Sequence, residues 1–164
     1  MKKFFLMAVV AIFSVSAVQA QIPVKYQGEV DAGYSIGVGS FAASRINLHT
    51  IHGIKVGRFF STGVGLGFDM YHEGGFDLIV PVYLNLKGYL PVSEKVAPFF
   101  SIDIGAGIWA TEAIQGASGL MVTPAVGVKF GKFKAQLGYN LQQLSSYGES
   151  VNVGAVQIRI GAMF

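Results

Sequence analysis

Three histidines, His49, His52 and His72, raise the question of metal binding or acid–base catalysis. In the alternating pattern described below, His49 points to one face of a strand, His52 to the other, and His72 lies near a loop. They do not converge on one site, and no glutamate stands at the spacing of a zinc motif. Cysteine is absent, which removes disulfides, thiol catalysis and thiolate ligands. The sequence therefore predicts no metal site and no cofactor.

Thr50 and His52 are the one candidate pair of nucleophile and base. Acyl transfer needs a hydroxyl group that is activated by a hydrogen-bonded base. Two side chains two residues apart on one strand face do not establish that contact. Since the fuller arrangement of nucleophile, base and orienting group is missing, the sequence predicts no catalytic residues and no enzymatic activity.

Glycines recur at every second position in Gly63–Gly67 and again at Gly37 and Gly39. A phosphate-binding loop has to lead from a strand into the N-terminus of a helix, and this pattern does not. Glycines with period two inside a strand all face the same way. They are interpreted as inward residues that relieve crowding and permit curvature in a narrow barrel.

The first twenty residues have the pattern of a secretory signal peptide. Lys2 and Lys3 precede the apolar segment Phe4–Val18, and Val18-Gln19-Ala20 is a small-x-small cleavage site. The apolar segment is shorter than the about 18 residues that a membrane-spanning helix needs. We expect residues 1–20 to be removed and residues 21–164 to form one domain. The formal net charge of +3 falls with the two lysines, so the basic balance predicts no nucleic-acid partner.

The last segment, Ser150–Phe164, is apolar at every second position from Val156 to Phe164. Period two is typical of a strand whose side chains alternate between two faces. Seven earlier segments share the pattern: Gln27–Gly39, Arg45–Gly57, Phe59–His72, Phe76–Leu90, Ala97–Thr111, Gly119–Phe130 and Phe133–Gln142. Each is long enough for the roughly 9–11 residues of a membrane-crossing strand. The sequence predicts an all-β fold, an eight-stranded antiparallel up-and-down transmembrane barrel.

Short connections and aromatic residues orient this predicted barrel. Gly57-Arg58, Pro91–Lys95 and Gly131-Lys132 are expected to be turns at the periplasmic end, where both termini also lie because the strand number is even. The loops Ser40–Ser44, Glu73–Gly75, Glu112–Ser118 and Tyr147–Glu149 are expected outside. Outward aromatics fall at the periplasmic strand ends (Phe60, Phe100, Phe130, Phe133 and Phe164) and at the outer ends (Phe68, Phe76 and Tyr139), as in the two aromatic girdles of membrane barrels.

The inward face carries nearly balanced charge. Its predicted acids and bases are Glu29, Asp31, Asp69, Asp77 and Asp103 against Arg45, Lys55, Lys87, Lys129, Lys134 and Arg159. Eight strands enclose a space that side chains nearly fill, so these charges are expected to pair in an ionic network in the lumen.

We also expect specific neighbours within this network. Pairing of Ser150–Phe164 with Gln27–Gly39 would bring Arg159 to the level of Asp31, within a residue or two. Folding about Ser40–Ser44 would set Glu29 opposite Lys55. The sequence therefore predicts one cluster of Glu29, Asp31, Lys55 and Arg159.

Together, the signal peptide, the eight alternating strands, the girdles and the terminal Phe164 resemble small outer-membrane barrels of the OmpA/OmpX type. The resemblance implies a multi-pass protein in the outer membrane of a Gram-negative bacterium, in contact with lipid and lipopolysaccharide. It also implies that the barrel-assembly machinery reads the terminal strand and Phe164. The chain departs from OmpA in lacking a peptidoglycan-binding domain after the barrel, and from OmpX in its short outer loops.

This resemblance implies a non-catalytic structural or interaction role in the cell envelope, and it identifies no extracellular partner. Two alternatives remain open at this point. Inward glycines could leave space for a narrow channel for ions or small apolar molecules. Some eight-stranded barrels are enzymes that modify lipid A, which is the second alternative.

Overall fold

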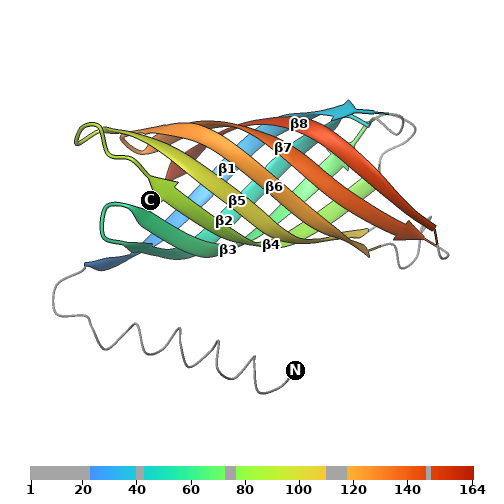
Figure 1. The fold of residues 1–164 in the computed structure, drawn as a ribbon, viewed down its shortest axis with the longest axis horizontal. Coiled ribbons are helices and arrows are strands. Elements are labelled where there is room, and N and C mark those ends of the chain that lie inside the picture. The colour runs from blue at the N-terminus through green and yellow to red at the C-terminus, as the bar shows by residue number, and fades with distance from the viewer. Residues whose placement is uncertain (1–22, 40–42, 73–76, 110–117, 147–148) are drawn as a thin grey trace, which may run out of the picture.

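The computed structural model of the protein describes residues 23–39, 43–72, 77–109, 118–146 and 149–164. These residues form eight β-strands: β1 (Val24–Val38), β2 (Arg45–Val56), β3 (Phe60–Tyr71), β4 (Asp77–Tyr89), β5 (Val96–Trp109), β6 (Ser118–Phe130), β7 (Phe133–Ser146) and β8 (Glu149–Met163). Each strand is antiparallel to the next, and β8 pairs with β1, so the sheet closes into a barrel (Figure 1). The predicted eight-stranded antiparallel barrel is confirmed.

Several predicted segments lie outside the described residues. They are the signal peptide at residues 1–20, the loop at 73–75, most of the loops at 40–44 and 112–118, and residues 147 and 148. Within the part of the chain that is described, no helix is long and apolar enough to cross a membrane.

Two strands are longer than the apolar pattern predicts. β7 continues past Gln142 to Ser146, where the polar residues from Gln143 onward pair with the start of β8. β1 begins at Val24 instead of Gln27, because Val24 and its neighbours pair with the end of β2. The other strand ends differ from the predicted ones by at most two residues. Backbone pairing thus extends beyond the segments in which side chains alternate.

The strands are staggered, and this shifts the first hairpin. Ser35 is the last residue of β1 with a partner on β2, namely Arg45. β1 then continues alone on that side, while Ile36 and Val38 pair with Val156 and Gly154 of β8. The β1–β2 register is therefore displaced from a symmetrical fold about residues 40–44. Such a stagger is required to close a barrel of tilted strands.

Short connections lie at one end of the barrel, which we call the turn end. Gly57 and Gly131 have φ angles of 61° and 59° in the turns after β2 and β6. Glycine adopts this left-handed conformation without the steric cost of a side chain. The beginning of β1 and the C-terminus lie at the same end (Figure 1), where the backbone of Phe164 exchanges two hydrogen bonds with Gly28.

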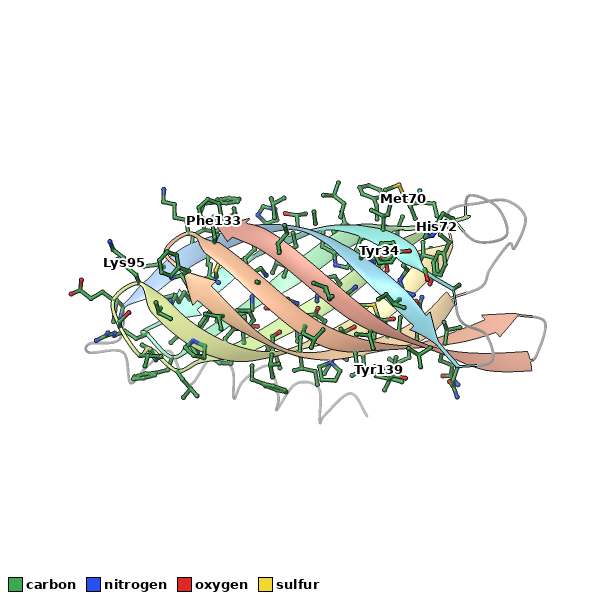
Figure 2. The ribbon with its side chains drawn as sticks, turned by 90° about the horizontal axis from the view of Figure 1, so that it is seen from above. Tyr34, Met70, His72, Lys95, Phe133 and Tyr139 are labelled. Atoms are coloured by element: carbon green, nitrogen blue, oxygen red, sulfur yellow. The ribbon has the colours of Figure 1, made fainter. Side chains whose placement is uncertain are left out.

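The distribution of polar and apolar side chains between the inside and the outside of the barrel is the reverse of that in a soluble protein. Apolar side chains point outward, and Val64, Leu120 and Ile160 are 60%, 59% and 63% exposed (Figure 2 shows the outer layer). Polar and charged side chains point inward, with Arg45 and Arg159 essentially buried. An apolar exterior around a polar interior is the pattern of a barrel whose surroundings are lipid.

Aromatic residues gather near both ends of the exterior. Phe60, Phe100, Phe130, Phe133 and Phe164 are exposed toward the turn end, while Phe68 and Tyr139 are exposed toward the other (Figure 2 labels Phe133 and Tyr139). Phe76 lies outside the described residues. The distribution matches the girdles that membrane barrels place at the two interfaces.

Inward glycines are expected to tolerate no added side chain. A Cβ at Gly65 would lie 2.2 Å from the ring of Tyr83, whereas a Cβ at the outward Gly88 would meet nothing within 4 Å. Because Tyr83 is buried and bonded to His49, Gly65→Ala should lower the free energy of unfolding by about 1–3 kcal/mol. Gly88→Ala should leave it nearly unchanged. Urea unfolding in detergent, followed by the gel shift between unboiled and boiled protein, measures both. Equal effects would mean that the lumen has room at Gly65.

Candidate functional site

Most of the charged residues that were predicted to face inward lie in the lumen. Among the predicted residues, Glu29, Asp31, Arg45, Asp69, Lys87, Asp103, Lys134 and Arg159 are buried inside the barrel. Lys55 and Lys129 are half-buried near the turn end. Asp77 begins β4, and its side chain lies outside the description. The lumen is therefore the candidate functional site, and it is built from all eight strands.

The first cluster in the lumen, the Glu29 cluster, joins two carboxylates to two lysines. Lys87 donates from Nζ to both carboxylate oxygens of Glu29 at 2.6 Å. Lys134 bonds to Glu29 as well, and its Nζ lies 2.8 Å from Oδ2 of Asp31. Gln27 donates to Glu29 at 2.8 Å. Two negative and two positive charges from β1, β4 and β7 thus neutralise one another.

A second cluster, the Arg159 cluster, crosses the lumen from β8 to β5. Arg159 donates from Nη2 to Oδ2 of Asp103 at 2.6 Å, and Asn85 donates to the other oxygen of Asp103 at 2.5 Å. Nη1 of Arg159 lies 3.1 Å from Nδ1 of His49. His49 also lies 3.0 Å from the hydroxyl of Tyr83. The arginine is thereby held by partners on β2 and β5.

The third cluster, the Arg45 cluster, lies toward the end opposite the turns. Nε of Arg45 is 3.3 Å from Oδ2 of Asp69. Its two terminal nitrogens donate to Tyr71 at 2.8 Å and to Asn140 at 2.5 Å. His49 contacts Asp69 through Nε2 at 2.8 Å. Because His49 bonds both Asp69 and Arg159, the second and third clusters form one continuous network.

Apolar side chains fill the lumen between these polar groups. Tyr89, Phe99 and Met163 form one buried group near the turn end. Ile51, Tyr83 and Met121 form a second. Within the described residues, ion pairs and large apolar side chains thus alternate along the lumen.

The predicted cluster of Glu29, Asp31, Lys55 and Arg159 is wrong in its pairing. Glu29 faces Ile51 on β2, and Lys55 faces Lys25, because the strands are staggered. Arg159 lies opposite Gly33, two residues from Asp31 as expected, but its ion pair is with Asp103. The nearest base to Asp31 is Lys134, which reaches it from β7.

Neutral residues complete the network, and the predicted charge set omitted them. Asn47 donates to Asp69 at 2.5 Å, and Asn140 donates to Thr123 at 2.7 Å while accepting from Arg45. They lie on the inward positions of their strands, so the same period of two that located the charges could have located them. Buried charges need such partners as well as opposite charges.

The other two histidines lie on the outside. His52 contacts the hydroxyl of Tyr26 through Nδ1 at 2.6 Å and that of Thr50 through Nε2 at 3.0 Å. His72 contacts the hydroxyl of Tyr34 at 3.2 Å. Thr50 also lies 3.1 Å from the carbonyl oxygen of Glu29, to which it can donate. Among the described residues, no three His, Cys, Asp or Glu side chains gather where they could hold a metal ion.

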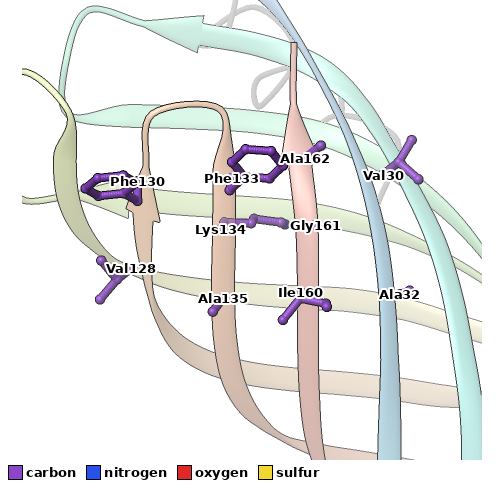
Figure 3. A pocket seen from close by; sticks show the side chains of 10 residues that line it. All are labelled: Val30, Ala32, Val128, Phe130, Phe133, Lys134, Ala135, Ile160, Gly161 and Ala162. Carbon is purple, nitrogen blue, oxygen red and sulfur yellow. The ribbon is translucent and has the colours of Figure 1, made fainter.

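A hollow of about 620 Å³ marks the outer face over β6, β7, β8 and β1 (Figure 3). The small residues Ala135 and Ala162 lie in it beside the larger Phe130 and Phe133. Lys134 contributes to the lining, but its ammonium group bonds to Glu29 inside the lumen. Among the described residues that line it, the hollow is apolar apart from the inward-reaching Lys134.

Known structures share this barrel at low sequence identity. Neisserial surface protein A (NspA) matches with a TM-score of 0.67 and 10% identity over 86% of this chain and 97% of that one. The outer membrane enzyme PagL matches with 0.57 and 10% identity, over 82% and 98%. The N-terminal barrel of Pseudomonas aeruginosa OprF matches with 0.53 and 13% identity, over 87% and 100%.

No family model and no curated protein matches the sequence. The structural likeness shows the fold: the chain has the eight-stranded barrel of small outer-membrane proteins.

A double-mutant cycle tests the ion pair of Arg159 and Asp103. Arg159→Met should lower the free energy of unfolding, since removing one partner of a buried pair typically costs about 3–5 kcal/mol. Asp103→Asn in the same chain should recover part of the loss. Asp31→Asn is the matched control, because Asp31 pairs with Lys134. Urea unfolding of the singles and doubles gives both coupling energies. A larger coupling for Asp31 than for Asp103 would contradict this pairing.

Proposed function

We propose that this protein is a non-catalytic outer-membrane barrel with a closed lumen and a structural or interaction role in the cell envelope. The observation that carries the proposal is the filled lumen. Ion pairs cross it from β1 to β4 and β7 and from β5 to β8, and apolar groups occupy it between them. A barrel built this way acts through its surfaces, because its inward side chains are engaged with one another across the lumen.

The side chains on the outer face indicate the environment of the barrel. The outward side chains are apolar, with aromatic residues near both ends, which suits the hydrocarbon layer of the outer membrane of a Gram-negative bacterium. The partners in this proposal are outer-membrane lipid and lipopolysaccharide. The hollow beside Phe130 and Phe133 offers these lipids a place for an acyl chain.

A lipid-modifying enzyme is the second candidate, since the contact of Thr50 with His52 favours it. The hydroxyl lies 3.0 Å from Nε2 of His52, on the lipid-facing side. Two features weaken the candidate. First, the hydroxyl of Thr50 can donate to the carbonyl oxygen of Glu29 instead of to His52. Second, the other ring nitrogen of His52 contacts the phenol of Tyr26, whereas a carboxylate at that position would orient the imidazole better. Mass spectrometry of lipid A from cells expressing the wild type or Thr50→Val separates the candidates, and a mass change that needs Thr50 would favour the enzyme.

The closed lumen predicts no conductance. In planar bilayers the wild-type protein should produce no stepwise current, because an ion entering the lumen would have to separate paired charges. Glu29→Ala combined with Lys134→Ala removes one cross-lumen pair and two long side chains, and it should raise conductance above the wild-type baseline. Steady current steps from the wild-type protein, with the same conductance as those of the variant, would support the narrow channel instead.

The role of Phe164 in assembly predicts a difference between cells and detergent. The ring of Phe164 packs beside Gly28 on the outer face, and 61% of the residue is exposed. Because it contributes little to the core, deleting Phe164 should impair refolding in detergent only slightly but strongly reduce insertion by the assembly machinery in cells. Deletion effects are compared with those of Phe133→Ala, which removes another exposed aromatic of the same girdle. Equal losses in both settings would assign Phe164 a packing role only.

A further inference from the structure

The hollow on the outer face lies directly beside the turn between β6 and β7. Phe130 and Phe133, which line it, are the last pair of the β6–β7 ladder, and the two-residue turn between them ends in Lys132. Small outward side chains such as Ala135 and Ala162 leave the space open next to these rings (Figure 3). Its volume of about 620 Å³ falls in the range of small-molecule sites, about 300–1,000 Å³.

Two exposed lysines stand at the turn-end edge of this hollow. Lys132 is exposed, and its carbonyl oxygen accepts a hydrogen bond from the backbone of Met163 at 2.7 Å. The other turn residue, Gly131, donates to the carbonyl oxygen of Lys95 at 2.8 Å. Lys95 is exposed as well, in the turn before β5 (Figure 2 labels it at this end). The backbone thus brings both lysines to the same turn.

Two carboxylates also lie at this end and have to be counted. Glu94 precedes Lys95 in the same turn, and the C-terminal carboxylate belongs to Phe164. Among the described residues, neither carboxylate lies within 4.0 Å of the ammonium group of Lys95 or Lys132. The two lysines are therefore not engaged in ion pairs within the protein.

The turn end as a whole keeps an excess of positive charge. In the described part of the chain, two carboxylates, those of Glu94 and the C-terminus, stand against six bases: Lys25, Lys55, Arg58, Lys95, Lys129 and Lys132. The charges of the Glu29 cluster beneath them cancel. This end of the barrel consequently attracts anions, and the two lysines at the hollow place part of that charge beside an apolar surface.

We propose that the hollow holds an acyl chain of an anionic phospholipid whose phosphate binds between Lys95 and Lys132. Phosphate oxygens accept charge-assisted hydrogen bonds from ammonium groups, and lysines near the end of a membrane segment extend toward the headgroups. The positive excess favours an anionic headgroup over a zwitterionic one. The inference rests on the proposed function for the lipid surroundings of the barrel, and it adds the class of lipid and the residues that select it.

The test places a fluorescent reporter at the hollow of the full folded chain. Trp109, the single tryptophan, ends β5, so Trp109→Phe combined with Phe133→Trp moves the indole to the wall of the hollow. The protein is reconstituted in bilayers of phosphatidylcholine that contain a minority of a lipid with brominated chains, which quench a tryptophan that they touch. Brominated phosphatidylglycerol should be enriched at position 133 about fivefold over brominated phosphatidylcholine, the preference that one lysine near an anionic headgroup provides.

Variants in this reporter background separate the headgroup from the chain. Lys95→Met and Lys132→Met should each lower the enrichment of phosphatidylglycerol. Ala135→Leu fills the hollow without changing any charge and should lower the enrichment too, and Ala162→Leu replaces it if that variant does not fold.

Arg58→Met is the matched control for charge. It removes another exposed cation of the turn end, in the turn between β2 and β3 and away from the hollow, and it should leave the enrichment in place. Val64→Trp in the Trp109→Phe background is the control for lipid access, because Val64 is exposed on β3, four positions from β7 in the ring.

The proposal is overturned if the two brominated lipids quench the reporter equally, or if either lysine variant keeps the full enrichment. Full enrichment in Ala135→Leu would show attraction of the headgroup with no chain in the hollow, which also overturns it. Quenching by both lipids far below that of the Val64→Trp reporter would mean that a second copy of the chain covers the hollow. Each of these outcomes leaves the barrel in its bilayer, so absent conductance and unmodified lipid A would still support the proposed function.

Discussion

The narrow lumen of an eight-stranded barrel is the constraint on which the rest of the structure depends. Side chains facing inward leave bulk water, and an unpaired charge there has a desolvation cost of several kcal/mol. Each buried inward arginine and lysine accordingly forms an ion pair with an acid. Arg45 pairs with Asp69 and Arg159 with Asp103. Lys87 pairs with Glu29, and Lys134 pairs with both Glu29 and Asp31. Arg45 and Asp69 lie on the neighbouring strands β2 and β3, whereas the other pairs connect strands that are not neighbours in the ring.

Polar groups on the exterior of the barrel also need partners within the protein, because lipid offers them none. Closing the sheet by pairing β8 with β1 leaves no unpaired edge, which a hydrocarbon layer requires. Some polar side chains that face outward bond to one another. His52 bonds to Tyr26 and Thr50. These two bonds give both ring nitrogens of His52 a partner on an otherwise apolar surface.

How far the sequence could predict this structure depends on the range of each interaction. Period-two alternation and short glycine turns are local, and they located all eight strands and the inward charges other than Asp77, whose side chain lies outside the description. Pairing across the lumen is not local: Lys134 and Glu29 are 105 residues apart, and Arg45 and Asn140 are 95 apart. The predicted pairing of Lys55 with Glu29 was wrong for this reason. It assumed a hairpin that is symmetrical about residues 40–44, and it ignored the stagger between strands that barrel closure imposes.

Charge is distributed unevenly along the barrel axis, and desolvation explains where the imbalance lies. Glu29, Asp31, Lys87 and Lys134 are all buried and sum to zero. Lys55 and Lys129 are half-buried, and Nζ of Lys55 lies 4.6 Å from the centre of the Tyr89 ring. A cation without a partner is tolerable only where solvent or a ligand reaches it. Because Lys55 and Lys129 are half-buried, solvent can reach them, and they do not need the cross-lumen ion pairs that the buried Lys87 and Lys134 have.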